Sequence, residues 1–284
     1  MKRENDKAQS GLPAVARRAK AGKRKRGPTP SPLNGERAGV RGENATWRAF
    51  ARGRSSHATV LLLLLFLCRG ALLAADNELT ELEHKQGWLL LFDGQTTNGW
   101  MTSDRKPCRT PVEQGSLNPH KSGHYMLVHT QQWTQFLLAL DFKISPNCNS
   151  GVFVRTASLT PRPGKDVGFN GIEIAIDDTK TAGYHDTGAI YDLVKPSRNA
   201  MKPVGEWNHL EVSCLGNRIE VVLNGDAVTR ADLDLFVEPY KRPDGSAHKF
   251  DIAYKDHPLT GYIGLQDHGA PCWFKNIKLK PITP

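Results

Sequence analysis

The chain has 284 residues and a formal net charge of +9, from 38 Lys and Arg against 29 Asp and Glu. The excess lies in residues 1–57, where 15 basic and 4 acidic residues give +11. Residues 76–284 hold 22 basic and 25 acidic residues, a net of −3, and Arg69 adds the remaining +1. Because the part long enough to fold is slightly acidic, its charge argues against a nucleic-acid partner.

Residues 1–57 are expected to form a disordered basic leader. The stretch 28–42 is rich in Pro, Gly and Arg and has no apolar period, so it cannot bury a core. It also resembles a translated intergenic repeat of bacterial genomes, which suggests a translation start further downstream. We therefore exclude this stretch from the folded part of the chain.

Residues 58–75 have the layout of a secretory signal peptide. Basic residues precede the apolar run Val60–Leu67, and small residues close it before Asp76. The run is shorter than the roughly 18 apolar residues that indicate a membrane-spanning helix. The segment predicts export to the periplasm or the extracellular space. The alternative is an uncleaved N-terminal anchor, and it would be the chain's only contact with a membrane.

Residues 76–284 are expected to form one domain made of strands. A short helix is predicted within Glu78–Lys85, and Asn224-Gly225 is a strong hairpin signal. Turn-rich links separate the predicted strands. These strands are Trp88–Phe92, Tyr125–His129, Phe136–Ile144, Ser150–Arg155, Gly171–Asp177, Gly188–Leu193, Trp207–Cys214, Arg218–Leu223, Gly261–Gln266 and Trp273–Lys280. The pattern predicts an all-β fold, a two-sheet antiparallel sandwich or jelly roll.

The region Asp226–Thr260 is the longest without clear strand signals. A loop of this length in a compact domain is either functional or a surface excursion, and the sequence leaves both open. The pairing of the cysteines is open as well. An exported protein permits disulfides, and Cys108, Cys148 and Cys272 are the candidates for one bridge, whereas Cys214 reads as a buried thiol in a strand.

The strand Ile172–Asp177 carries the clearest alternation of apolar and polar residues. Its three Ile predict a core-facing side, so Glu173, Ala175 and Asp177 share the other face. Two carboxylates four residues apart on a strand lie about 13 Å apart, whereas glycosidases place theirs about 5–9.5 Å apart. This pair alone therefore does not suit two-carboxylate hydrolysis. A solvated polar sheet face is the alternative interpretation.

Two further strands carry candidate site residues. Phe153 and Arg155 are expected to share a face with Gly151, where an aromatic ring and a guanidinium would suit a sugar. Gln266 and His268 are expected to share a face with a bare Gly264. His268 is a candidate general acid or base because the pKa of histidine lies near neutrality; a structural role in its turn is the alternative.

Several segments together resemble one known family. They include Asn149–Arg155, Gly171–Ile174, Thr187–Asp192, Gly205–Asn208, Leu223–Gly225 and Gly264–Gly269. The set is similar to the 3-keto-disaccharide hydrolase domain family, formerly a domain of unknown function (number 1080). The resemblance implies a concanavalin A-like jelly roll, export in bacteria, and action on glycosides that carry a ketone at C3. It implies a site formed by Arg155, Glu173, Tyr191, Gln266 and His268.

A ketone at C3 acidifies the C2 proton, so one base and an oxyanion clamp would suffice for elimination and rehydration. The hypothesis assigns Glu173 or His268 as the base and Arg155 and Gln266 as the clamp, with Tyr191, Phe153 and Asp177 binding the saccharide. A divalent cation acting as a Lewis acid is a further hypothesis, with no specific ligand motif. The alternatives are a non-catalytic carbohydrate-binding domain and a laminarinase-like glycosidase, whose Glu-x-Asp-x-x-Glu strand is missing.

Overall fold

The computed structural model describes residues 75–283. The predicted basic leader (1–57), and the predicted signal segment (58–75) except for its last residue, lie outside the described residues. None of the helices within residues 75–283 combines the length and apolarity that crossing a bilayer requires.

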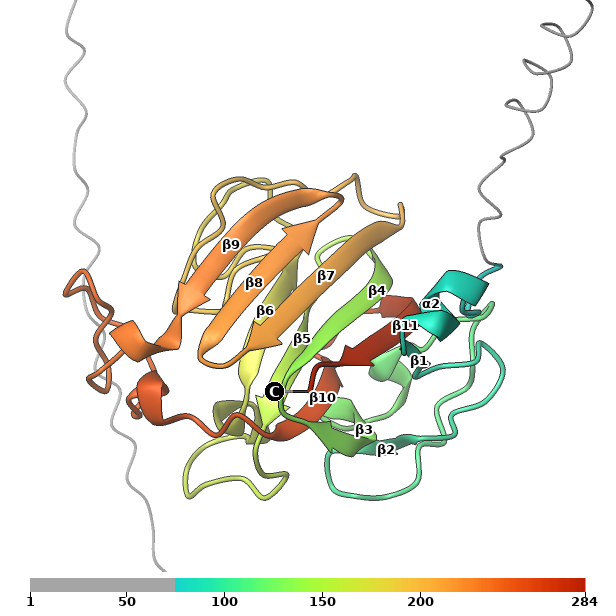
Figure 1. Ribbon diagram of the computed structural model, residues 1–284, viewed down its shortest axis with the longest axis horizontal. Coiled ribbons are helices and arrows are strands. Elements are labelled where there is room, and N and C mark those ends of the chain that lie inside the picture. Colours follow the sequence, from blue (N-terminus) through green and yellow to red (C-terminus); the bar gives the residue numbers. More distant parts are fainter. Residues whose placement is uncertain (1–74, 284) are drawn as a thin grey trace, which may run out of the picture. The chain divides into compact units, whose positions relative to one another are not determined.

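Two antiparallel sheets pack face to face, with the six-stranded sheet in front in Figure 1 and the five-stranded sheet behind it. The six-stranded sheet has the order β1 (Leu89–Leu90), β11 (Cys272–Pro281), β4 (Phe136–Ile144), β7 (Asn208–Leu215), β8 (Arg218–Leu223) and β9 (Asp226–Asp232). The five-stranded sheet has the order β2 (Trp100–Thr102), β3 (Met126–Trp133), β10 (Gly261–Gln266), β5 (Asn149–Thr156) and β6 (Ile172–Asp177). The expected all-β sandwich of two antiparallel sheets is confirmed.

Within residues 75–283, helical structure is limited to short pieces outside the strands. They are α2 (Glu81–Lys85) and the single 3₁₀ turns η1 (Pro119–Lys121), η2 (Val167–Asn170), η3 (Leu233–Leu235) and η4 (Tyr254–Asp256). The predicted short helix therefore exists. Thr80 caps its first turn, and Glu83 completes the capping box by accepting from the Thr80 amide.

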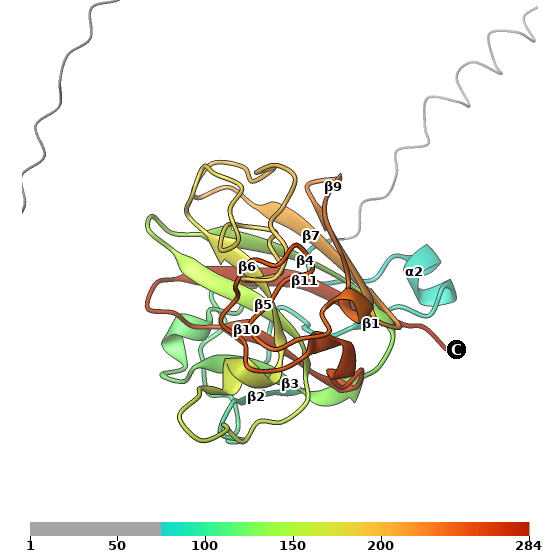
Figure 2. The same cartoon turned by 90° about the vertical axis from the view of Figure 1, so that its left-hand side faces the viewer.

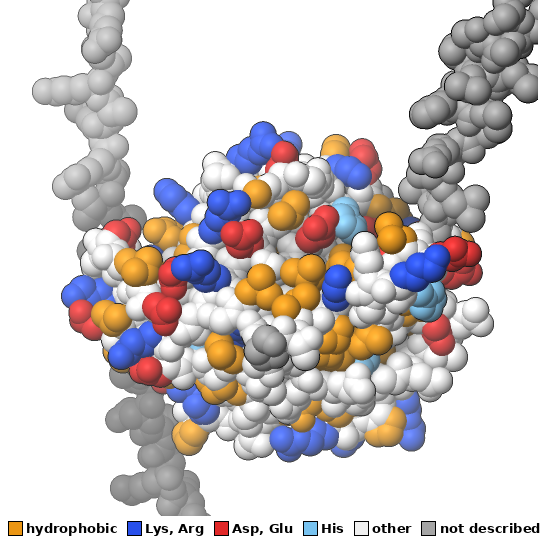
Figure 3. All heavy atoms as spheres, in the orientation of Figure 1, with side chains coloured by type: hydrophobic (Ala, Val, Ile, Leu, Met, Phe, Trp, Pro, Cys, Tyr) orange, Lys and Arg blue, Asp and Glu red, His pale blue; other side chains and the backbone are white. Residues whose placement is uncertain are grey.

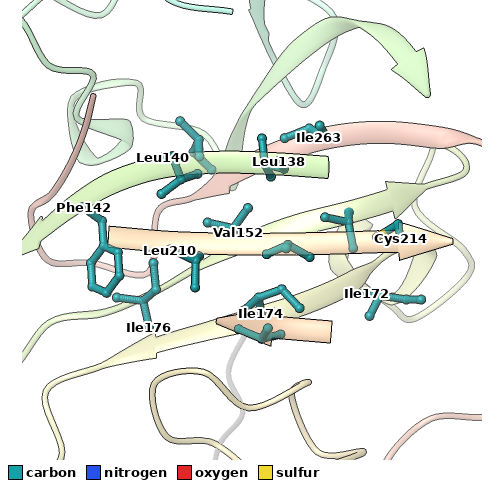
Figure 4. Close-up of a cluster of buried hydrophobic side chains, with 14 of the residues drawn as sticks. Leu138, Leu140, Phe142, Val152, Ile172, Ile174, Ile176, Leu210, Cys214 and Ile263 are labelled. Atoms are coloured by element: carbon teal, nitrogen blue, oxygen red, sulfur yellow. The ribbon is translucent and has the colours of Figure 1, made fainter. Parts of the chain in front are cut away.

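The core lies between the two sheets because side chains along a strand point alternately to its two faces. In β4, every second residue from Phe136 to Ile144 is buried. Figure 4 shows Leu138, Leu140 and Phe142 of this strand facing Val152 and Ile174 of the other sheet. Burying a side chain of this kind contributes about 1.5–3 kcal/mol, so the alternation fixes which face of each strand turns outward.

Two local predictions differ from the structure, and one short strand has no counterpart among the predictions. Gly188–Leu193 forms only isolated bridges through Ile190, because positive φ angles at Gly188 (88°) and Asp192 (55°) turn the chain. The strand β9 lies inside the region that was expected to lack strands; it pairs with β8 through the Asn224-Gly225 hairpin. The three-residue strand β2 is too short to produce a sequence pattern.

All four cysteines of the described chain are buried free thiols. Cys148 and Cys272 lie beside one another, at the start of β5 and of β11, and the contact between the two thiols adds to the burial that raises the pKa of Cys272. Cys214 is a buried thiol in β7, as its strand pattern predicts.

The stretch 233–260, which we call the long segment, is fastened to the rest of the domain by one buried ion pair. Arg242 donates to the Asp192 carboxylate at 2.5 Å and to its carbonyl at 2.7 Å, and both side chains are largely buried. The other oxygen of the Asp192 carboxylate accepts from the Lys249 amide at 2.7 Å. Asp192 therefore holds the long segment at two points.

The substitution Arg242→Ala should destabilise the domain by about 3–5 kcal/mol, because it leaves the Asp192 carboxylate buried without its partner. Urea unfolding measures the loss. The matched control is Arg230→Ala, which breaks an exposed pair with Glu220 and should cost at most about 1 kcal/mol. Equal losses in the two variants would contradict this role for Asp192.

Candidate functional site

The outer face of the five-stranded sheet carries the candidate site. The antiparallel register of β5 and β6 places Phe153 opposite Glu173 and Gly151 opposite Ala175. Val152 and Ile174, one position along, point into the core between the sheets. Phe153 and Glu173 therefore point away from that core, and in Figure 2 their strands lie on the far side of the domain from β7 and β9.

Gly151 makes room for the side chain of Glu173. A Cβ atom at position 151 would lie 2.7 Å from Cγ and 2.8 Å from Oε1 of Glu173. The Glu173 side chain therefore lies across the backbone of β5, and only glycine permits this close approach. The contact therefore covers one side of the Glu173 side chain.

Burial raises the pKa of the Glu173 carboxyl to about 8, and the negative charge of Asp166 adds to the shift. The Lys249 ammonium of the long segment acts in the opposite direction. A carboxyl group with a pKa near neutrality is able to take up and release a proton at physiological pH, which is the property that a general acid or base needs.

Tyr125 and Gln266 lie on the same face as Glu173. The Gln266 amide Nε2 donates to the Tyr125 hydroxyl at 3.1 Å. Burial, Asp166 and Glu173 all raise the pKa of Tyr125. The hydroxyl therefore remains protonated, and Gln266 is held by it in a fixed orientation, with its Oε1 buried and without a partner among the described residues.

Tyr191 and Lys249 form the side of the site nearest the long segment. The Lys249 Nζ lies 4.3 Å from the centre of the Tyr191 ring, and His185 stacks on the same ring at 4.6 Å between centroids. Burial and the charge of Glu173 raise the pKa of Tyr191. Lys249 forms no ion pair within residues 75–283, so its ammonium donors are open to a ligand.

Arg155 does not lie on this face, and its predicted placement beside Phe153 is wrong. The residue has a left-handed φ of 53° at a point where the register between β5 and β10 shifts. The extra residue breaks the two-residue alternation, so the side chain turns toward the opposite sheet. There it is fully buried and donates to the Gly216 carbonyl at 2.6 Å, in the turn between β7 and β8.

Phe153 and Gly264 also differ from expectation. Phe153 is only 1% exposed, because it packs in a second apolar cluster with Met126, Leu159 and Val167. Its ring therefore supports Tyr125, 6.0 Å away between centroids, and is not an open platform for a sugar. Gly264 is not bare either, since a Cβ there would lie 2.6 Å from the Met126 sulfur.

His268 and Asp177 lie at the margin of the site. His268 is exposed in the loop after β10 and makes no hydrogen bond or ion pair with another described residue. Its neighbour Asp267 instead contacts His120 at 3.0 Å. Asp177 accepts from the Asn149 amide at 3.1 Å, and burial together with Asp186 and Asp178 raises its pKa.

The structure thus brings together Glu173, Gln266 and Tyr191 and adds Tyr125, Asp166 and Lys249, which the sequence analysis missed. Asp166 and Lys249 lie in connecting segments with no alternation, so no pattern places them beside a strand. Within residues 75–283, no three His, Cys, Asp or Glu side chains gather closely enough to hold a metal ion.

The substitution Glu173→Gln should remove a pH dependence of stability. Below the ordinary Glu pKa of 4.5 both the folded and the unfolded chain hold the proton. Between pH 4.5 and 8 the unfolded chain loses it and the folded chain keeps it, so the wild type loses stability as pH rises. Urea unfolding at pH 5 and pH 8.5 should show Glu173→Gln gaining at least about 1 kcal/mol on the wild type. The exposed control Glu206→Gln should show no such gain, and parallel behaviour of both variants would refute the shift.

Comparison with known proteins agrees with the family resemblance of the sequence motifs. The family model of the 3-keto-alpha-glucoside-1,2-lyase-like domain matches residues 87–280. The 3-keto-disaccharide hydrolase of Bacteroides thetaiotaomicron is 26% identical over 231 residues, which are 68% of this chain and 78% of that protein.

Two crystal structures of glycosyl hydrolase candidates from Parabacteroides distasonis share the fold. One is 25% identical with a TM-score of 0.59, covering 74% of this chain and all of that chain. The other is 29% identical with a TM-score of 0.55, covering 69% of this chain and 99% of that chain. The resemblance noted in the sequence motifs is thereby confirmed. Because the family model spans more than half of its length, the chain belongs to the family of 3-keto-alpha-glucoside-1,2-lyase-like domains.

Proposed function

We propose that the protein is an exported hydrolase that cleaves 3-keto-glycosides, including 3-keto-disaccharides, through removal of the C2 proton. The observation that carries the proposal is the Glu173 carboxyl, whose pKa burial raises to about 8 on a face that also presents hydrogen-bond donors. The relationship to a 3-keto-disaccharide hydrolase supports the choice of substrate.

In the proposed reaction the Glu173 carboxylate takes the proton from C2 of the sugar. The electrons of the C–H bond form a C2–C3 double bond, and the former ketone oxygen becomes an enolate. The enolate then collapses: the C3 ketone forms again, a double bond forms between C1 and C2, and the C1 leaving group departs with its bonding electrons. The hydroxide part of a water molecule adds to C1, the proton of that water neutralises the oxygen of the leaving group, and the proton held by Glu173 returns to C2. The sum is hydrolysis. A single base suffices, and the spacing between Glu173 and Asp177 is irrelevant to this route.

The enolate needs donors, and the structure changes which residues are proposed to supply them. Arg155 is buried against the opposite sheet, so it leaves the clamp. Lys249 takes its place, because its ammonium has no carboxylate partner in the described chain and influences Glu173 electrostatically. Tyr191 and the Tyr125–Gln266 pair supply the remaining polar contacts to the sugar. We assign the base to Glu173 and not to His268, since His268 makes no contact with this group.

The decisive measurement is turnover of methyl 3-keto-α-glucoside and 3-keto-trehalose by purified wild type and variants. Glu173→Gln should lower kcat by at least about 100-fold, the usual contribution of a general base. His268→Ala and the exposed control Glu206→Gln should stay near the wild-type rate.

The wild-type kcat/KM should rise with pH and reach half its maximum near pH 8, because Glu173 must be ionised. In Lys249→Met this midpoint should move to higher pH, since the ammonium that lowers the pKa is lost.

Each part of the assignment can fail separately. Full activity in Glu173→Gln would show that another group is the base. Wild-type protein that binds both sugars but turns over neither would favour a carbohydrate-binding domain. A substrate that carries deuterium at C2 gives a further test. If it reacts at the same rate as the unlabelled substrate and loses no deuterium to the solvent, removal of the C2 proton is excluded as a slow step.

Export is the part of the proposal that rests on residues 58–75 alone. N-terminal sequencing of the protein from its native host should give a mature chain that begins near Asp76, after the small residues that close the apolar run. Peptides from residues 5–50 in the same sample would show that the basic leader is made and retained, and would overturn both predictions about the N-terminal region.

A further inference from the structure

A second group of ligand-type side chains lies on the outer face of the six-stranded sheet, on the opposite side of the sandwich from Glu173. Trp273 of β11 pairs with Lys143 of β4, and Trp207 immediately precedes β7, whose first residue Asn208 pairs with Phe142. Trp273, Lys143 and Trp207 therefore form a row across three neighbouring strands. The residues that alternate with them, such as Phe142 and Phe274, are buried in the core.

This row borders a hollow of about 540 Å³, which we call the tryptophan hollow; it is lined by Asp76, Glu113, Gln114, Ser116, Lys143, Trp207, Trp273 and Lys275. Small-molecule sites commonly have volumes of about 300–1,000 Å³. Several other hollows of the described chain have similar volumes, but two indole rings distinguish this one. Both rings are partly exposed. Figure 3 shows this side of the molecule, where hydrophobic side chains lie among scattered charges.

The Lys143 ammonium lies near both indole rings. The Lys143 Nζ lies 4.9 Å from the centre of the Trp207 ring and 5.1 Å from that of Trp273. The Lys275 Nζ lies 4.5 Å from the Trp207 ring and is paired with Asp76. Cations at these distances are attracted to the ring faces. Both rings therefore have a neighbouring cation that favours their observed orientation.

Hydrogen-bond donors and acceptors converge on the same hollow. The Trp273 Nε1 donates to the Glu113 carboxylate at 2.7 Å, and two backbone bonds between Leu117 and Phe274 hold that loop against β11. Lys143 forms no ion pair with any residue of 75–283, so its ammonium has donors to spare. The other carboxylate oxygen of Glu113 lies 3.9 Å from Lys121, which leaves it capacity to accept from a hydroxyl.

We propose that the tryptophan hollow is a second saccharide-binding site, separate from the site of the reaction. Sugars present apolar C–H faces, which pack on indole rings, and hydroxyl groups, which both donate and accept. The hollow offers both kinds of contact. Its charged residues balance, two Lys against Asp76 and Glu113, so it favours a neutral oligosaccharide over an acidic one. The site would keep the protein on a glycan while the opposite face acts.

The test uses the ¹⁵N-labelled full chain and two neutral, unoxidised probes, maltotriose and cellotriose. The indole N–H signals of Trp207 and Trp273 are assigned by Trp→Phe substitution and followed during titration. At least one probe should shift both signals saturably at millimolar concentration. Trp273→Ala should weaken binding at least tenfold, and Lys143→Ala should weaken it as well. The control Trp88→Ala, at a partly exposed Trp in another hollow, should bind as the wild type does.

Turnover of methyl 3-keto-α-glucoside by Trp273→Ala should stay within twofold of the wild type, which separates this site from the reaction. Thermal unfolding verifies that each variant is folded. If Trp273→Ala is not folded, the loss of saccharide binding in Lys143→Ala is the deciding measurement. The proposal is overturned if neither probe moves the two indole signals, or if binding survives in both Trp273→Ala and Lys143→Ala. It is equally overturned if only the acidic probe trigalacturonate binds. None of these outcomes depends on whether Glu173 is the base.

Discussion

The register between β5 and β6 is the constraint on which the candidate site depends. It sets Gly151 beside Glu173, so that the carboxyl group lies across a backbone that carries no side chain. The contact contributes to the burial that raises the pKa of this carboxyl. A slip of one residue would turn Glu173 into the core and Ile174 outward, so the register is fixed by the same Ile side chains that build the core.

The electrostatics of the site come from segments that lie far from β6 in sequence. Asp166 raises the proton affinity of Glu173, and Lys249 lowers it. Lys249 reaches this position because Asp192 holds the long segment through both Arg242 and the Lys249 backbone amide. A buried ion pair of this kind is weak evidence for stability, and here it fixes the position of a cation beside the proposed base.

The two outer faces of the sandwich differ in what they offer a sugar. On the five-stranded side, the aromatic residues Phe153 and Tyr125 are largely used for packing, and the polar groups hold one another in place. On the six-stranded side, Trp207 and Trp273 are partly exposed and form no part of the core. The proposed reaction needs positioned groups of low mobility, whereas the proposed retention on a glycan needs contact surface. The division between the faces matches these two needs.

The sequence by itself determined the all-β class, most strand positions, the core-facing side of β6 and the family, because these follow from local alternation and from motifs along the chain. Its resemblance to the family grouped Glu173, Gln266 and Tyr191 in one site. It placed Arg155 wrongly, since a single left-handed residue reverses the alternation without leaving a pattern. Only the tertiary structure decided that Lys249 and Asp166 flank Glu173 and that Trp207 lies across Lys143 from Trp273. These neighbours come from separate strands and loops, and their contact depends on how the sheets and connecting segments pack.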